Sequence, residues 1–170
     1  SHLLTIAEAQ TINRNIEAQT ANWANGTIGS LVSAGGGLKR GNVGIFDAAS
    51  YNGADPEVGT VRNAKAKLVL SNGGEIWDWS GNVWEWIYGA GANGTLGTPN
   101  AVIFETSGPA AWNVVVLNEE RPIIGPSNSG WTGDYGVGSY YGGATTNAVL
   151  RGGSWGNDAD AGVFAFSADY

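Results

Sequence analysis

Cysteine is absent from the chain, and histidine occurs once, as His2. Without cysteine the chain cannot form a disulfide framework, a thiolate metal site or a cysteine nucleophile. The Ser-His pair at positions 1 and 2 is typical of a cloning remnant, so we expect the natural domain to cover residues 3–170 and to lack imidazole. The commonest group for acid–base catalysis near neutral pH is then missing, which argues against an enzyme.

Basic residues are also few: 8 Lys and Arg stand against 15 Asp and Glu, for a net charge of −7. They are scattered, whereas a protein that binds phosphates needs clustered positive charge. We therefore expect no nucleic-acid partner. No apolar run approaches the roughly 18 residues of a membrane-spanning helix, so membrane insertion is not expected. No signal peptide is visible in this sequence.

Glycine and aromatic residues are abundant, with 28 Gly, 8 Trp and 6 Tyr among 170 residues. Disordered chains lack aromatic residues, so this composition predicts a packed protein with many turns. A chain of this length can bury a sizeable core without a metal or a disulfide. We find no repeat of fixed period and no linker, and we expect one domain.

The start of the chain predicts a helix. Thr5 and Glu8 have the spacing of a capping box, in which each side chain accepts a hydrogen bond from the backbone at the other residue. Ala9, Ile12 and Ile16 then recur at helical spacing, which predicts a helix over residues 6–19.

The remainder predicts short strands separated by long irregular loops, and hence an α+β fold. Residues 68–70 and 75–79 flank a Ser-Asn-Gly-Gly turn and predict a β-hairpin. Alternation over residues 83–88 predicts a strand with Trp84, Trp86 and Tyr88 on one face. Further strands are expected at residues 148–151 and 162–166, and residues 114–117 fit either a strand or the end of a helix.

Two segments carry a more specific signal. Residues 80–86 read Ser-Gly-Asn-Val-Trp-Glu-Trp, and residues 150–155 read Leu-Arg-Gly-Gly-Ser-Trp. Together they resemble the two signature motifs of the formylglycine-generating-enzyme (sulfatase-modifying factor) family, and the opening helix fits as well. The resemblance implies the C-type lectin fold of that family, with a structural motif formed by Asn82, Trp84, Trp86, Arg151, Gly152, Gly153 and Trp155.

The same resemblance implies a structural Ca²⁺ site. Its ligands would be the side chains of Asp78 and Glu85 and the carbonyl oxygens of Gly81 and Val83, which are the oxygen donors that a hard cation prefers. In the alternative interpretation no metal binds, Glu85 accepts backbone amide hydrogen bonds, and Asp78 caps the turn.

The aromatic residues of the motifs are expected to belong to the scaffold. Trp84, Trp86 and Trp155 would bury large areas in a fold rich in loops, although Trp84 and Trp86 could instead form a ligand platform. Arg151 is expected to tie loops together through its several N–H donors, with anion binding as the alternative.

The catalytic chemistry of the family cannot be assembled. Its oxygen-dependent enzymes use cysteines that also hold copper, and a related branch uses histidine-ligated iron. The sequence has no Cys, and its one His, His2, is assigned to the cloning remnant. We therefore expect no catalytic cofactor and no enzymatic activity.

The C-terminal segment, residues 151–170, looks like that of the variable proteins of diversity-generating retroelements, which share this fold. Adenine-directed mutagenesis rewrites that segment and makes it a ligand-binding face. The resemblance implies a virion- or cell-surface protein that binds a protein or glycan. It also implies a closing Gly-Phe-Arg segment, which does not occur after Tyr170. The expected ligand-binding residues are polar or amphipathic, as in paratopes: Asn157, Asp158, Asp160, Ser167, Asp169 and Tyr170. Tyr135, Tyr140 and Tyr141 from an upstream loop could line the same face, with packing that covers the scaffold as an equal alternative.

Two other interpretations stay open. The chain could be a structural module of a surface or fibre assembly with the same fold and no dedicated ligand, its polar C-terminal segment merely solvated. More remotely, it could be a degenerate enzyme that holds a substrate peptide without turning it over.

Overall fold

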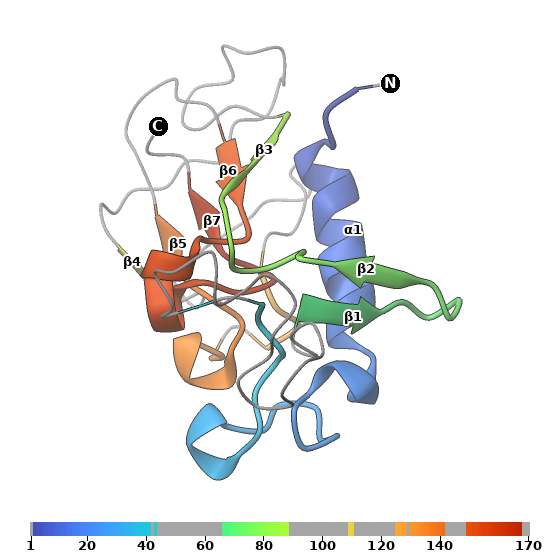
Figure 1. Ribbon diagram of the computed structural model, residues 1–170, viewed down its shortest axis with the longest axis vertical. Helices are drawn as coiled ribbons and strands as arrows, with labels where there is room; N and C mark the ends of the chain where they lie inside the picture. The colour runs from blue at the N-terminus through green and yellow to red at the C-terminus, as the bar shows by residue number, and fades with distance from the viewer. Residues whose placement is uncertain are drawn as a thin grey trace, which may run out of the picture.

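The computed structural model describes residues 2–41, 43, 66–88, 125–128, 130–141 and 149–167, together with the backbone of residues 109–110. It is a mixed α+β structure. In Figure 1 the helix α1 (Ile6–Glu17) stands at one side with the hairpin β1–β2 against it, and a five-stranded sheet lies at the other side. No helix in these ranges is long and apolar enough to cross a membrane.

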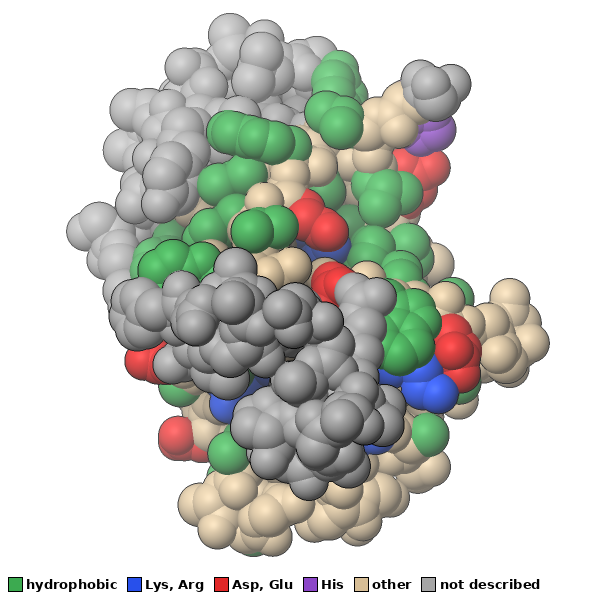
Figure 2. Space-filling model, viewed as in Figure 1, with side chains coloured by type: hydrophobic (Ala, Val, Ile, Leu, Met, Phe, Trp, Pro, Cys, Tyr) green, Lys and Arg blue, Asp and Glu red, His purple; other side chains and the backbone are tan. Residues whose placement is uncertain are grey.

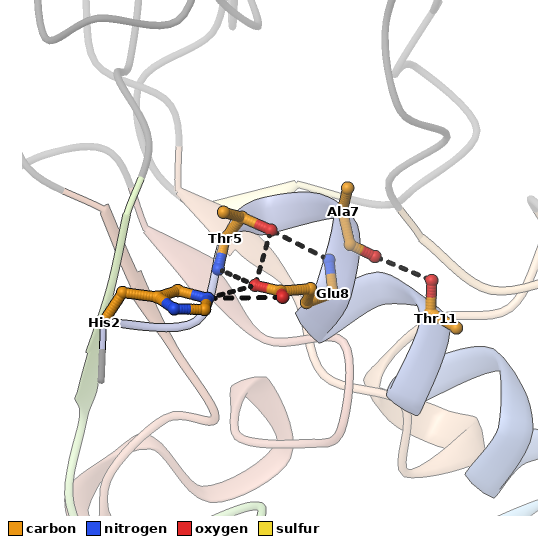
Figure 3. Close-up of polar contacts among 5 residues, drawn as sticks. All are labelled: His2, Thr5, Ala7, Glu8 and Thr11. Atoms are coloured by element: carbon orange, nitrogen blue, oxygen red, sulfur yellow. Dashed lines mark hydrogen bonds and ion pairs between the residues drawn. The ribbon is translucent and has the colours of Figure 1, made fainter.

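The predicted capping box begins α1. The Glu8 backbone N–H donates to Thr5 Oγ1 over 3.2 Å, and the Thr5 N–H donates to Glu8 Oε2 over 2.8 Å. Figure 3 shows both contacts, with the His2 ring on the outer side of the Glu8 carboxylate. Ala9 and Ile16 are buried as the spacing predicts. The helix ends at Glu17 rather than Gln19, and a 3-10 turn, Thr20–Asn22, follows.

The predicted hairpin is confirmed. Strand β1 (Lys67–Val69) pairs antiparallel with β2 (Glu75–Trp77), placing Leu68 opposite Ile76. Gly73 in the turn has a φ of +81°, the left-handed conformation that glycine adopts without penalty. The hairpin is fastened to the helix region, because Asn22 Nδ2 donates to the Val69 carbonyl and Asn22 Oδ1 accepts from the Val69 N–H.

The larger sheet has the strand order β3-β6-β7-β5-β4. Its members are β3 (Glu85–Ile87), β6 (Val149–Arg151), β7 (Phe166–Ser167), β5 (Tyr140–Tyr141) and β4 (Pro109–Ala110). The strands expected at residues 83–88 and 148–151 are thus present. The strand expected at 162–166 is displaced, since residues 162–164 form a bend and a turn and pairing starts only at Phe166. Residues 114–117 lie outside the described residues.

One hydrophobic cluster joins the helix, the hairpin and the sheet. Buried aromatic rings dominate it, and Trp23 also donates its indole N–H to the Glu17 carbonyl over 2.9 Å. The members are Ile6, Ala9, Ile16, Trp23, Leu38, Leu68, Trp79, Ile87, Trp131, Val137, Tyr140, Val149, Val163, Phe164 and Phe166.

Candidate functional site

The two sequence motifs form one structural unit. Strands β3 and β6 are neighbours, with Glu85 directly opposite Arg151. Two further backbone hydrogen bonds join the motifs, from the Gly81 N–H to the Gly152 carbonyl (2.9 Å) and from the Trp155 N–H to the Asn82 carbonyl (3.1 Å). The segment that follows β6 is therefore held against the turn that precedes β3.

Glycine is required where this unit turns. Gly153 has a φ of +76°, and a Cβ there would lie 2.6 Å from the Cα of Ala161. Both the backbone conformation and the close approach of the returning chain exclude a larger residue. The chain can thus leave β6, form an exposed loop and return to the core at Ala161.

Arg151 is the last residue of β6 and is buried. Its side chain is 2% exposed, and its guanidinium stacks on the Trp79 ring, 3.5 Å from the ring centroid. Nη1 pairs with the Glu85 carboxylate, while Nε and Nη2 are buried and have no hydrogen-bond partner among the described residues. In this part of the chain Arg151 joins β6 to Glu85 on β3 and to Trp79 in the preceding loop, through one ion pair and one ring contact, rather than through the several donor contacts that were expected.

Burial dominates the electrostatics of this pair. Burial lowers the pKa of the Arg151 guanidinium to about 10, against the opposing effect of the Glu85 charge. Burial also raises the pKa of the Glu85 carboxyl above its ordinary value; the Arg151 charge opposes this rise and the charge of Asp78 adds to it. Each charge of the pair therefore costs free energy in the fold.

The predicted Ca²⁺ ligands do not fit that role as the chain arranges them. Asp78 and Glu85 are close enough to interact electrostatically, but the Glu85 carboxylate is already paired with Arg151. A cation would have to compete with a buried guanidinium for the same oxygens. Gly81 and Val83 lie in the connecting turn, where Gly81 is buried and Val83 exposed. Within the described residues no group of three or more acidic, His or Cys side chains is placed to hold a metal.

The motif tryptophans are less buried than expected. Trp86 is 54% exposed, so the expectation that it belongs to the core is wrong. Trp84 is half-buried against Tyr141, with ring centroids 6.0 Å apart, and Trp155 is also half-buried. Trp86 on β3 and Tyr88 just after it point outward, whereas Ile87 faces the core.

The predicted ligand-binding residues fall into distinct environments. Asp158 is exposed, as expected. Ser167 is 1% exposed, so the expectation of an exposed position is wrong for this residue. Tyr140 is 2% exposed, so of the two interpretations open for it, packing is the one observed. Phe166, which points to the opposite face of β7 from Ser167, is also buried, so the protein covers both faces of the sheet at this strand. Asp169 and Tyr170 lie outside the described residues.

The remaining candidates are partly buried and have structural partners. Asn157 Oδ1 accepts hydrogen bonds from the Ser154 N–H and hydroxyl (2.8 and 2.7 Å). Asp160 Oδ1 accepts from the Ser139 hydroxyl over 2.7 Å. Tyr135 stacks on Trp131 with ring centroids 6.0 Å apart. These contacts, and that of Tyr141 with Trp84, leave each side chain only partly available to a ligand.

Among the predicted ligand-binding residues, those in one exposed loop are the best placed to meet a ligand. This loop is the 3-10 segment Trp155–Asp160, which we call the 155–160 loop. Gly156, Asp158 and Ala159 are its exposed positions. The surrounding protein holds it largely through backbone atoms: the Ser139 N–H donates to the Asp160 carbonyl over 3.0 Å, and Arg40 Nη1 donates to the Asp158 carbonyl over 2.9 Å. Arg40 was not predicted, and no sequence signal links it to a residue 118 positions away.

Comparison with protein-family models, with curated proteins and with solved structures gives no match for this chain.

Proposed function

We propose that this protein is a non-catalytic binding module that presents the 155–160 loop to a protein or glycan ligand. The observation that carries the proposal is the separation of roles along residues 151–167. Gly156, Asp158 and Ala159 are exposed, while residues 151–153 and 161–167 are buried. A binding surface that varies in sequence needs such a division, because exposed substitutions usually change stability by only about 0.5 kcal/mol.

The proposal includes the C-type lectin fold of the formylglycine-generating-enzyme type. It is supported by the pairing of the two motifs as neighbouring strands, which gives the resemblance a common structural setting. It also includes diversification by a retroelement and display on a virion or cell surface. The coding DNA tests the diversification: a nearby near-repeat of the last 60 or so bases that differs only at adenines is expected, and its absence counts against it.

A display library tests the binding function directly. We would randomise Gly156, Asp158 and Ala159 and select against panels of proteins and glycans. A matched control library would randomise Val163, Phe164 and Ala165, which are at most 1% exposed. We expect folded members and specific binders from the first library and loss of folded protein from the second. A folded first library that yields no binder would refute the proposed function.

The absence of catalysis is part of the proposal. Incubation of the protein with a cysteine-containing sulfatase peptide, copper and oxygen should leave the mass of the peptide unchanged. Formation of formylglycine would refute this part, because the family chemistry depends on cysteines that this chain lacks.

A second candidate is a structural module of a surface assembly, and the exposed hydrophobic side chains favour it. Trp77, Val83, Trp86 and Tyr88 are 40–56% exposed. Figure 2 shows hydrophobic side chains gathered over β3 and its surroundings, with acidic side chains among them. Exposed apolar patches are common at protein interfaces. Sedimentation of the wild type and of a Trp86→Ser/Tyr88→Ser variant tests whether this face mediates self-assembly. Association that depends on concentration in the wild type and is lost in the variant would support the structural module. A monomer in both proteins would exclude self-assembly through this face.

A further inference from the structure

Asp158 has an unusual backbone conformation at the centre of the 155–160 loop. Its φ is 44° and its ψ is −117°, which interrupts the 3-10 segment. A positive φ is unfavourable for a residue with a side chain, and this region of the map is used mainly by glycine. Such a conformation persists only where the surroundings hold it in place.

Arg40 is placed to hold this conformation. Its Nη1 donates to the Asp158 carbonyl over 2.9 Å and lies 3.5 Å from the Ala161 carbonyl oxygen. The Ala161 N–H in turn donates to the Asp158 carbonyl over 3.3 Å. The guanidinium thus connects the two ends of the turn that runs from Asp158 to Ala161. Burial lowers the pKa of Arg40, while the charges of Asp158 and Asp160 raise it.

Arg40 contacts the loop through the main-chain oxygens of Asp158 and Ala161, so this contact does not require a particular side chain at position 158. The Asp158 side chain itself is exposed. Glycine adopts this conformation without strain, and the contact with Arg40 supports it for a residue that carries a side chain. The loop can therefore keep one backbone shape while its exposed chemistry changes.

We propose that Arg40 is a positioning residue that fixes the backbone at Asp158 and thereby presents the exposed side chain of that position to a ligand. The purpose assigned to this contact rests on the proposed function, but the contact can be tested without a ligand.

The test compares Arg40→Met in two backgrounds, the wild type and Asp158→Gly, by hydrogen exchange. The Ala161 amide reports on the turn, and the Gly152 amide, which donates to the Ala165 carbonyl over 2.9 Å, serves as the reference in the scaffold. We expect Arg40→Met to accelerate exchange at Ala161 relative to Gly152 by roughly 10-fold or more. Asp158→Gly should reduce that acceleration several-fold, because glycine adopts the conformation without support.

Lys39→Met is the matched control. Its Nζ donates to the Ala21 carbonyl over 2.9 Å, away from the loop, so we expect no change at Ala161. If Arg40→Met does not fold, Arg40→Lys replaces it, since lysine keeps the charge but lacks the planar fork of donors. The expected result is then a smaller acceleration at Ala161, again reduced by Asp158→Gly.

Two results would overturn the proposal. One is unchanged exchange at Ala161 when Arg40 is replaced. The other is an equal acceleration with and without Asp158→Gly, which would mean that Arg40 only fills space. Neither result bears on whether the randomised library yields binders, and a library without binders leaves the exchange result intact. The failure of this inference and the failure of the proposed function are therefore distinguishable.

Discussion

Replacing Arg151 by Met should stabilise the protein, although arginine at this position is part of the motif. The guanidinium is 2% exposed, and two of its nitrogens are buried without a hydrogen-bond partner in the part of the chain that the structure describes. Its ion-pair partner there, Glu85, has a side chain that is 44% exposed and can be hydrated when the pair is lost. Methionine is unbranched and of similar length, and its sulfur makes favourable contacts with aromatic rings such as that of Trp79.

The magnitude follows from the pKa of Arg151. Burial lowers it from the ordinary 12.5 to about 10. Since one pH unit corresponds to about 1.4 kcal/mol, the fold penalises this charge by about 3 kcal/mol. The stacking on Trp79 that is lost contributes about 0.5–2 kcal/mol in the opposite direction. We therefore expect a gain of about 1–2 kcal/mol, equivalent to a rise in Tm of roughly 2–8 °C for a chain of this size.

Thermal and urea unfolding at pH 7 measure this directly. Lys67→Met is the matched control: its ion pair with Glu75 is 2.8 Å long and exposed on both sides. Exposed pairs contribute about 0–1 kcal/mol, so little change is expected there. A fall of several degrees for Arg151→Met, with the control unchanged, would refute the reasoning. It would mean that the guanidinium stabilises the fold by more than its burial costs.

Four further outcomes are expected. Thr5→Ala should lower the free energy of unfolding by about 1 kcal/mol through loss of the helix cap. Hydrogen bonds from Thr5 lower the pKa of the Glu8 carboxyl, so the contribution of Glu8 to the stability of the fold is present above pH 4.5 and is lost as the pH falls through the lowered pKa. Glu8→Gln should remove this part of the pH dependence of Tm. A pH profile of Tm that is unchanged in the variant would contradict this expectation. In urea unfolding, Trp23→Ala should lower the free energy of unfolding by about 3–5 kcal/mol, and Trp86→Ala should lower it by only about 0.5 kcal/mol. Equal losses of stability in the two variants would show that Trp86 is a core residue. Since Glu85 is already paired with a guanidinium, Tm should not respond to a chelator or to added Ca²⁺, whereas a rise with Ca²⁺ would support the metal site.

The local elements of this fold were predictable because their determinants lie close together in the sequence. The capping box of Thr5 and Glu8 and the turn around Gly73 each involve only a few neighbouring residues, and both are present. The strands over residues 85–87 and 149–151 also have local patterns. The pairing of these two strands could be expected only through the family resemblance, since no local pattern specifies a partner 66 residues away.

Burial and position within the sheet were not predictable in the same way. Ser167 is polar and follows the apolar run of residues 163–166, so an exposed position after that run was a reasonable expectation. It is buried because the protein covers both faces of β7, where Phe166 on the opposite face is buried as well. Trp86 is large and apolar, yet it lies on the outer face of an edge strand. The sequence likewise could not predict Arg40, whose role depends on the three-dimensional path of residues 158–161.

The strand order of the larger sheet has a consequence for how the protein folds. Strand β7 is the last of the described strands in the chain, yet it occupies the middle of the sheet and pairs with β6 on one side and β5 on the other. During synthesis β3, β5 and β6 emerge before the strand that unites them. Contacts between residues far apart in sequence slow folding, and incomplete sheets expose unpaired edges that promote aggregation. The next strand after the 155–160 loop is thus also the one that joins β6 to β5, so the described sheet can form only after the segment proposed to vary has been synthesised.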